Sequence, residues 1–425
     1  MSDSTLSHHP SHRSLRERLA YRERSPVIST IRPAADPELP PLEQDADHAP
    51  EDVPERCARD DDDEELVRHP DLWFADGSIV LRAEDTLFRV HVSQLSRHSA
   101  VFADMLSLPQ PACSSSAEED ESREEDRIEG CPALFLYDRA EDVMHLLHAL
   151  YDGPNFGDNG REDFRAVSGI LRLANKYDIE KLQRQALEHL RTAWPMTLRG
   201  WDAREDLARM FELESGLQQG FRYPSPVAII NLAREVDAPE LLPAAFYDLS
   251  RYSYTLIFGV SEGEHDPLGA GSARAGTLAH TDIQKLTLGK EAAAHAVTWL
   301  IQSMAHGSHR EARHLAEGGG APPFSYGFAQ RDATHHRRRS AGLVCTSASA
   351  CRKDFGELVE LATQHYLFDR ERGCADPLYV AEELGQLKSA EFSECKACAR
   401  SLEGWAARER ERMWKLIPAW FRLGP

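Results

Sequence analysis

The pattern of apolar and polar positions predicts ordered structure from about residue 67 onward. Apolar residues alternate with polar ones over 79–90 and then recur at helical spacing over 92–106. The alternating part predicts two short strands around a polar turn at Ala83–Asp85. The helical part predicts two short helices that begin near Ser93 and Ser99, because a serine side chain can accept hydrogen bonds from free amides at a helix start.

Farther along, the pattern predicts one more strand and then mainly helices. Residues 131–138 (CPALFLYD) predict a short buried strand. A helix with one apolar face should follow, since Val143, Leu146, Leu147 and Leu150 recur at i, i+3, i+4 and i+7. Tyr254–Phe258 could form a strand, and 280–305 and 391–417 are predicted helices, the latter ending at Pro418.

A pattern within 171–190 recurs 59 residues later and predicts a second helical hairpin of similar build. We expect Asp178 to cap the second helix of the first hairpin. The matched positions are Leu173, Ala174, Asp178, Leu182, Ala186 and Leu190, which correspond to Leu232, Ala233, Asp237, Leu241, Ala245 and Leu249.

Composition divides the chain into five segments. The first is rich in proline, serine, histidine and charged residues, which predicts disorder, and an acidic run interrupts the second. The predicted segments are a disordered tail (1–66), an α+β domain (67–195) with an acidic insertion (109–130), an α-helical region (196–305), a linker (306–345) and a helical C-terminal region (346–425).

The charge and hydropathy of the chain limit its partners. A net charge of −21 argues against direct binding of nucleic acid or of an anionic membrane, because both are polyanions. Apolar runs are too short to span a bilayer, and the first residues lack the apolar core of a secretory signal. We therefore expect an intracellular protein of the cytoplasm or nucleus with reduced cysteines.

The 67–195 segment resembles the BTB/POZ domain family, and its amino-acid sequence is similar to the large fungal set of such proteins. Motif residues occur in the family's order: an aspartate in the first strand, then F-x-x-H, L-x-x-x-S, F-x-x-M, a closing aromatic, and the tyrosine of L-A-x-K-Y. The residues at these positions are Asp71, Phe88, His91, Leu95, Ser99, Phe102, Met105, Tyr151 and Tyr177.

This resemblance implies a short mixed sheet flanked by helices that serves as a dimerisation and adaptor module. We expect a non-enzymatic protein that self-associates through 71–105 and has no catalytic residue. His91 should be a packed residue bonded to backbone. A cullin-type ubiquitin ligase adaptor is an alternative, although the acidic insertion replaces the apolar-x-Glu contact of such relatives and 127–129 has the wrong spacing.

Two further alternatives come from short motifs. Residues 259–263 fit G-x-S-x-G, so a serine hydrolase using Ser261 is a candidate if 254–258 is the strand that this motif requires. The acidic runs and Arg337–Arg339 suggest a transcription cofactor, which the missing DNA-binding motif opposes. Neither displaces the protein-binding interpretation.

Cysteines provide the remaining candidate chemistry. Cys395 and Cys398 form a C-x-x-C pair, and with Cys345 and Cys351 they could supply four zinc ligands, with Cys374 or His365 as a substitute for one. The alternative is free thiols in a helical core, which we favour because a C-x₅-C pair is irregular. We therefore expect no cofactor, and structural zinc is the alternative.

Overall fold

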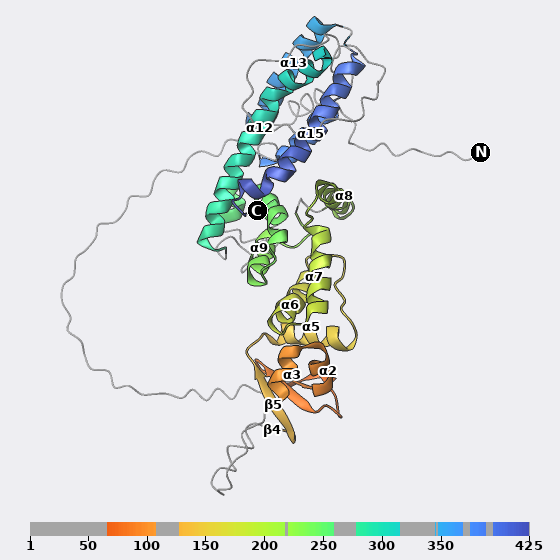
Figure 1. Ribbon diagram of the computed structural model, residues 1–425, viewed down its shortest axis with the longest axis vertical. Helices are drawn as coiled ribbons and strands as arrows, with labels where there is room; N and C mark the ends of the chain where they lie inside the picture. Colours follow the sequence, from red (N-terminus) through yellow and green to blue (C-terminus); the bar gives the residue numbers. More distant parts are fainter. Residues whose placement is uncertain are drawn as a thin grey trace, which may run out of the picture.

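The computed structural model describes residues 66–107, 127–216, 220–258, 278–314, 345, 347–368, 375–387 and 394–424. Along its long axis, a sheet with its covering helices lies at one end and a group of long helices at the other (Figure 1). Nearly all of the predicted tail, most of the acidic insertion, Ser261, Cys374 and most of the linker fall outside the described residues.

The described residues form a mixed sheet with strand order β1-β3-β2-β5-β4. Its strands are β1 (Val67–Trp73), β2 (Ile79–Ala83), β3 (Thr86–Val90), β4 (Arg127–Ile128) and β5 (Cys131–Leu136). The predicted hairpin is confirmed, because β2 and β3 pair antiparallel around a turn in which Glu84 adopts a φ of 49°. β1 runs parallel to β3, and β5 parallel to β2.

Helices cover the sheet and enclose the first hydrophobic core. They are α2 (Val92–His98), α3 (Ala100–Ser107), α5 (Ala140–Tyr151), α6 (Asp163–Lys176) and α7 (Glu180–Ala193). All four residues of the predicted apolar face of α5 are buried in this core, where α5 contacts helix α6 and strands β1 and β2. The α+β class expected for this part of the chain is thereby confirmed.

Strand β5 is less buried than predicted. Leu136 is buried, but Phe135 is 44% exposed and stacks edge-on against the exposed Tyr137. The strand has one face on the core, while its other face is left partly open beside the two-residue edge strand β4. The apolar run in 131–138 therefore forms a half-buried strand that ends in an exposed aromatic pair.

Only one of the two expected serine caps forms. Ser99 Oγ accepts a hydrogen bond from the Phe102 amide at 3.0 Å, so it caps α3 as predicted. Ser93 lies inside the first turn of α2, which begins at Val92. The Val92 amide instead donates to Ser78 Oγ at 3.0 Å, and this makes a cap at Ser93 unnecessary.

The 59-residue repeat corresponds to two helical turns with the same backbone. The second copy comprises α9 (Pro226–Glu235), the 3₁₀ turn η2 (Pro239–Leu241) and α10 (Leu242–Ser250). Asp178 and Asp237 both have a φ of 52°. The next amide donates to the carbonyl five residues back in each copy, Ile179 to Ala174 and Ala238 to Ala233, both at 2.8 Å. Asp178 thus ends α6 in a Schellman-type turn rather than capping α7, which corrects the expectation.

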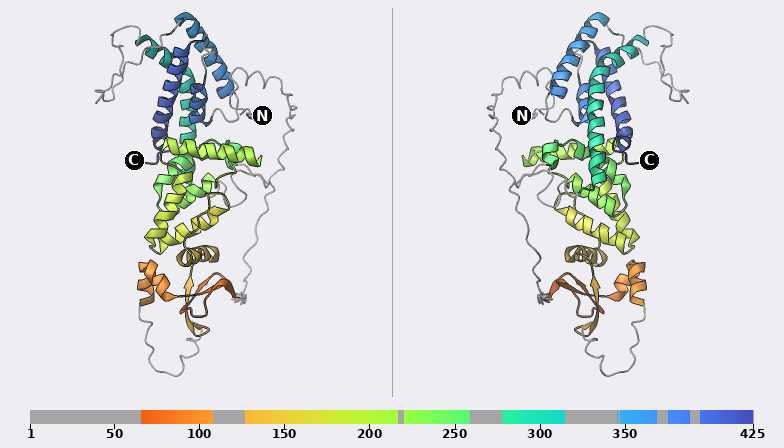
Figure 2. Two further views of the ribbon diagram at one scale, coloured as in Figure 1. Left: turned by 90° about the vertical axis from the view of Figure 1, so that its right-hand side faces the viewer. Right: turned by 90° about the vertical axis from the view of Figure 1, so that its left-hand side faces the viewer.

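The second half of the described chain is helical and encloses its own core. Its helices are α8 (Leu198–Ser215), α11 (Tyr254–Phe258), α12 (His280–His314), α13 (Ala348–Ala362), the π-helical turn η5 (Thr363–Phe368), α14 (Pro377–Gly385) and α15 (Lys396–Trp420). α12 and α15 lie side by side, and α8 runs crosswise to them (Figure 2). α12 extends to His314, so the predicted linker begins later than 306. None of the described helices is both long and apolar enough to cross a membrane.

The last helix continues past Pro418, which was expected to end it. Proline removes one amide donor, and near a helix end few bonds are lost. Just beyond, Phe421 is fully buried against the Phe246 ring at 5.4 Å. Gly289 of α12 makes room for it, since a Cβ there would come within 1.9 Å of the Phe421 ring. Burial of Phe421 offsets the missing bond.

Candidate functional site

Most of the family-motif positions lie in the first core. Phe88, Leu95 and Phe102 are buried and Met105 packs at the edge of the same core, whereas Asp71 is exposed on β1. The apolar motif residues therefore serve to pack the first core. The polar and aromatic positions make two more specific sets of contacts.

The first set joins the end of β3 to the end of α5. The His91 amide donates to Tyr151 Oη at 3.0 Å, and His91 Nδ1 lies 2.8 Å from the same oxygen. His91 Nε2 lies 3.3 Å from Asp76, and this hydrogen bond lowers the pKa of the Asp76 carboxyl. Phe74 stacks on Tyr151 with ring centroids 4.7 Å apart. The His91 ring therefore contacts side chains, not backbone as expected.

The second set joins α3 to the turn between α6 and α7. Ser99 Oγ donates to the Tyr177 carbonyl at 2.6 Å while it caps α3. The Phe102 and Tyr177 rings stack with centroids 4.3 Å apart. The Tyr177 hydroxyl donates to Asp138, and burial raises the pKa of that hydroxyl. Both sets of contacts connect elements that are distant in sequence. The motif residues in them therefore have a structural role.

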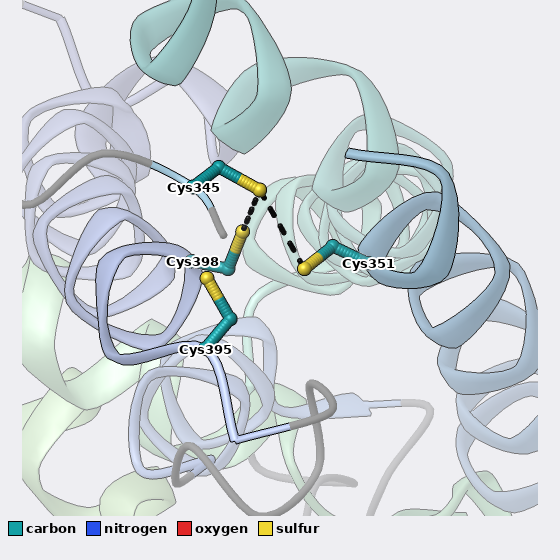
Figure 3. Close-up of side chains that lie close together, drawn as sticks. All are labelled: Cys345, Cys351, Cys395 and Cys398. Carbon is teal, nitrogen blue, oxygen red and sulfur yellow. Dashed lines mark hydrogen bonds between the residues drawn. The ribbon is translucent and has the colours of Figure 1, made fainter. Parts of the chain in front are cut away.

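Four cysteines from distant parts of the chain converge in the C-terminal half, and we call Cys345, Cys351, Cys395 and Cys398 the cysteine cluster (Figure 3). Their sulfur atoms all lie within 4.8 Å of one another. The Cys345 sulfur lies 3.6 Å from that of Cys351 and 3.8 Å from that of Cys398. The irregular spacing that argued against a common site is therefore no obstacle.

Two helix N-termini position the cluster. Cys345 precedes α13 and Cys351 lies in its first turn, while Cys395 is the N-cap residue of α15 and Cys398 lies in the first turn of that helix. Both helices pack against α12, which brings their starts together. His365, the proposed substitute ligand, is outside this group and its ring packs on Tyr366 instead.

Burial raises the pKa of thiols in the cysteine cluster. Three of the cysteines are at most 2% exposed, and Cys345 is half-buried. Burial raises the pKa of the Cys351 thiol to about 12 and also raises that of Cys398. At neutral pH the Cys351 and Cys398 sulfurs are therefore thiols unless a cation is present to stabilise the thiolates.

A buried ion network that no sequence pattern indicated lies in the helical half. Arg204 contacts Asp248 at 2.6 Å, and Arg251 contacts Glu205 at 2.7 Å and Asp376 at 3.2 Å. The Arg204 guanidinium also lies within 4.8 Å of three ring centroids, those of Trp194, Trp201 and Tyr223. The network fixes α8, α10 and the start of α14 to one another. Its charged residues lacked any pattern that would predict burial.

No family model, no curated protein and no solved structure matches the chain.

Proposed function

We propose that 67–195 is a BTB/POZ-like module and that the protein is a non-enzymatic adaptor or scaffold, which forms homodimers through this module. The observation that supports this most is the edge strand β1. It is the terminal strand of the described sheet and pairs with β3 alone. An edge strand presents unpaired amides and carbonyls that a second strand can bond.

The pairing of β1 within its own sheet is interrupted. Val67 and Arg68 pair with the start of β3, and pairing resumes only at Trp73. Pro70 lies in the interrupted part, and proline is compatible with an edge position because it has no amide to donate. Val67 is 58% exposed beside the exposed Leu66. The exposed apolar residues support burial of apolar surface on association, while Pro70 limits new strand bonds to the other positions of β1.

The motif contacts support the same proposal in another way. The His91–Tyr151 contact holds the end of β3 and the start of α2 against α5, and the Ser99–Tyr177 contact holds α3 against the turn between α6 and α7. A rigid, preorganised surface lowers the entropic cost of association. A two-fold axis would then place the same strand and helix surface of each copy in contact. The proposal includes neither a catalytic residue nor a catalytic cofactor.

The alternatives gain less support. Tyr254–Phe258, the strand that a hydrolase using Ser261 requires, is helix α11. Residues 127–129 are the nearest match to the apolar-x-Glu contact of cullin-binding relatives. Ile128 of this segment lies in β4 and pairs with Cys131.

Co-purification of two differently tagged full-length copies tests the proposal. The two tags should purify together, and Val67→Asp should abolish this, because it places a charge on the edge strand. The matched control is Leu213→Asp, which adds the same charge at a 70% exposed apolar position on α8. Absence of co-purification in the original chain, or equal loss in both variants, would overturn the dimer.

A further inference from the structure

The sulfur spacing in the cysteine cluster fits ligands around a single ion. Zinc bound tetrahedrally by thiolates at about 2.3 Å places neighbouring sulfurs about 3.8 Å apart. Two of the sulfur pairs lie 3.6 and 3.8 Å apart, and all four sulfurs lie within 4.8 Å of one another. A disulfide would require about 2.05 Å, so the four cysteines form no disulfide with one another.

The ligand chemistry selects the kind of ion. Four cysteine sulfurs form a soft donor set, which favours zinc over magnesium or calcium. The four sulfurs would complete a tetrahedral shell and leave no position for water or substrate. Three of the residues are buried, which excludes competing solvent. These properties describe a closed structural site and not a catalytic one.

Local charge favours a bound ion with four thiolates, which has a net charge of −2. The starts of α13 and α15 both face this charge, and a helix N-terminus has a partial positive charge that stabilises anions. The nearby side chains carry both signs: Arg352 and Lys396 follow cluster cysteines in the sequence, whereas Glu394 precedes Cys395 and Lys353 pairs with Glu357. The two helix starts therefore supply the balancing charge.

We propose that the cysteine cluster binds one Zn²⁺ ion through four thiolates and thereby fixes the start of α13 to the start of α15. Binding forms four zinc–sulfur bonds, and each thiol releases one proton to solvent. The C-x₅-C pair anchors the residues that precede α13, and the C-x-x-C pair anchors those that enter α15. The site is independent of the β1 edge and of dimer formation.

Cobalt titration of the reduced full-length protein tests the site directly. After treatment with chelator, Co²⁺ should bind at about one equivalent per chain and give the thiolate charge-transfer and visible bands of tetrahedral cobalt, which Zn²⁺ then abolishes. Elemental analysis of protein purified without chelator should give about one zinc per chain. The cobalt titration uses the unaltered chain and does not depend on how any variant folds.

A matched pair of variants assigns the ligands. Cys398→Ser should lose the charge-transfer band or weaken cobalt affinity by at least about tenfold. Cys131→Ser is the control, since the Cys131 sulfur lies in β5 near the Gly77 carbonyl and outside the cluster. The proposal is overturned if the reduced original chain shows no charge-transfer band, or if Cys398→Ser and Cys131→Ser bind cobalt equally well.

Discussion

Replacing Ser99 with alanine removes a single hydroxyl group but should strongly destabilise the N-terminal module (67–195). The hydroxyl of this buried residue accepts from the Phe102 amide at 3.0 Å and donates to the Tyr177 carbonyl at 2.6 Å. Loss of a helix cap costs about 1 kcal/mol. A buried carbonyl left without its partner adds about 1–3 kcal/mol, so we expect destabilisation of about 2–4 kcal/mol.

Hydrogen exchange measured by mass spectrometry is the suitable assay, because the chain has two cores and its unfolding need not be a single transition. Peptides from α3 and from the α6–α7 turn should exchange faster in Ser99→Ala, while peptides from α12 and α15 should not change. Ser93→Ala is the control, since Ser93 is exposed and caps no helix. Equal exchange of the α3 peptides in the two variants would contradict this prediction.

Two other predictions concern the same half of the chain. Asp178→Gly should stabilise it by up to about 1 kcal/mol, because Asp178 has a φ of 52°, where glycine is unstrained; slower exchange around the turn would show this, and faster exchange would contradict it. Burial holds the pKa values of His145 and His189 below the usual 6.5. Because the unfolded chain binds these protons more readily, stability should fall as pH drops below about 6.5, and a urea midpoint that does not change between about pH 8 and 5 would contradict this.

Local patterns predicted the elements whose neighbours are close in sequence. Alternation placed the β2–β3 hairpin, and helical spacing placed the buried face of α5. The 59-residue repeat correctly indicated two similar helical turns, although the role of Asp178 differed. These features depend on periodicity and backbone preference, which short windows contain.

Tertiary packing decided what the sequence did not reveal. Pro418 was expected to end a helix, but burial of Phe421 against Phe246 and Gly289 keeps the chain helical. Buried arginines Arg204 and Arg251 sit in a region whose charges resemble any solvated helix face. In both cases the deciding partner lies on another element.

For the cysteine cluster too, the sequence predicted some features and tertiary packing determined others. Residue type and the C-x-x-C spacing identified the four candidates, but the sequence favoured free thiols. Convergence of the cysteines depends on α13 and α15 both packing on α12, which spacing along the chain does not encode. Geometry therefore changed the preferred interpretation of these residues, while their identities were already predictable.

Light scattering coupled to size exclusion tests the proposed homodimer most directly. The full-length chain has a mass of 47.7 kDa. At micromolar concentration we expect twice this mass, with a shift towards the mass of a single chain on dilution or in Val67→Asp. A mass of one chain at every concentration would contradict it.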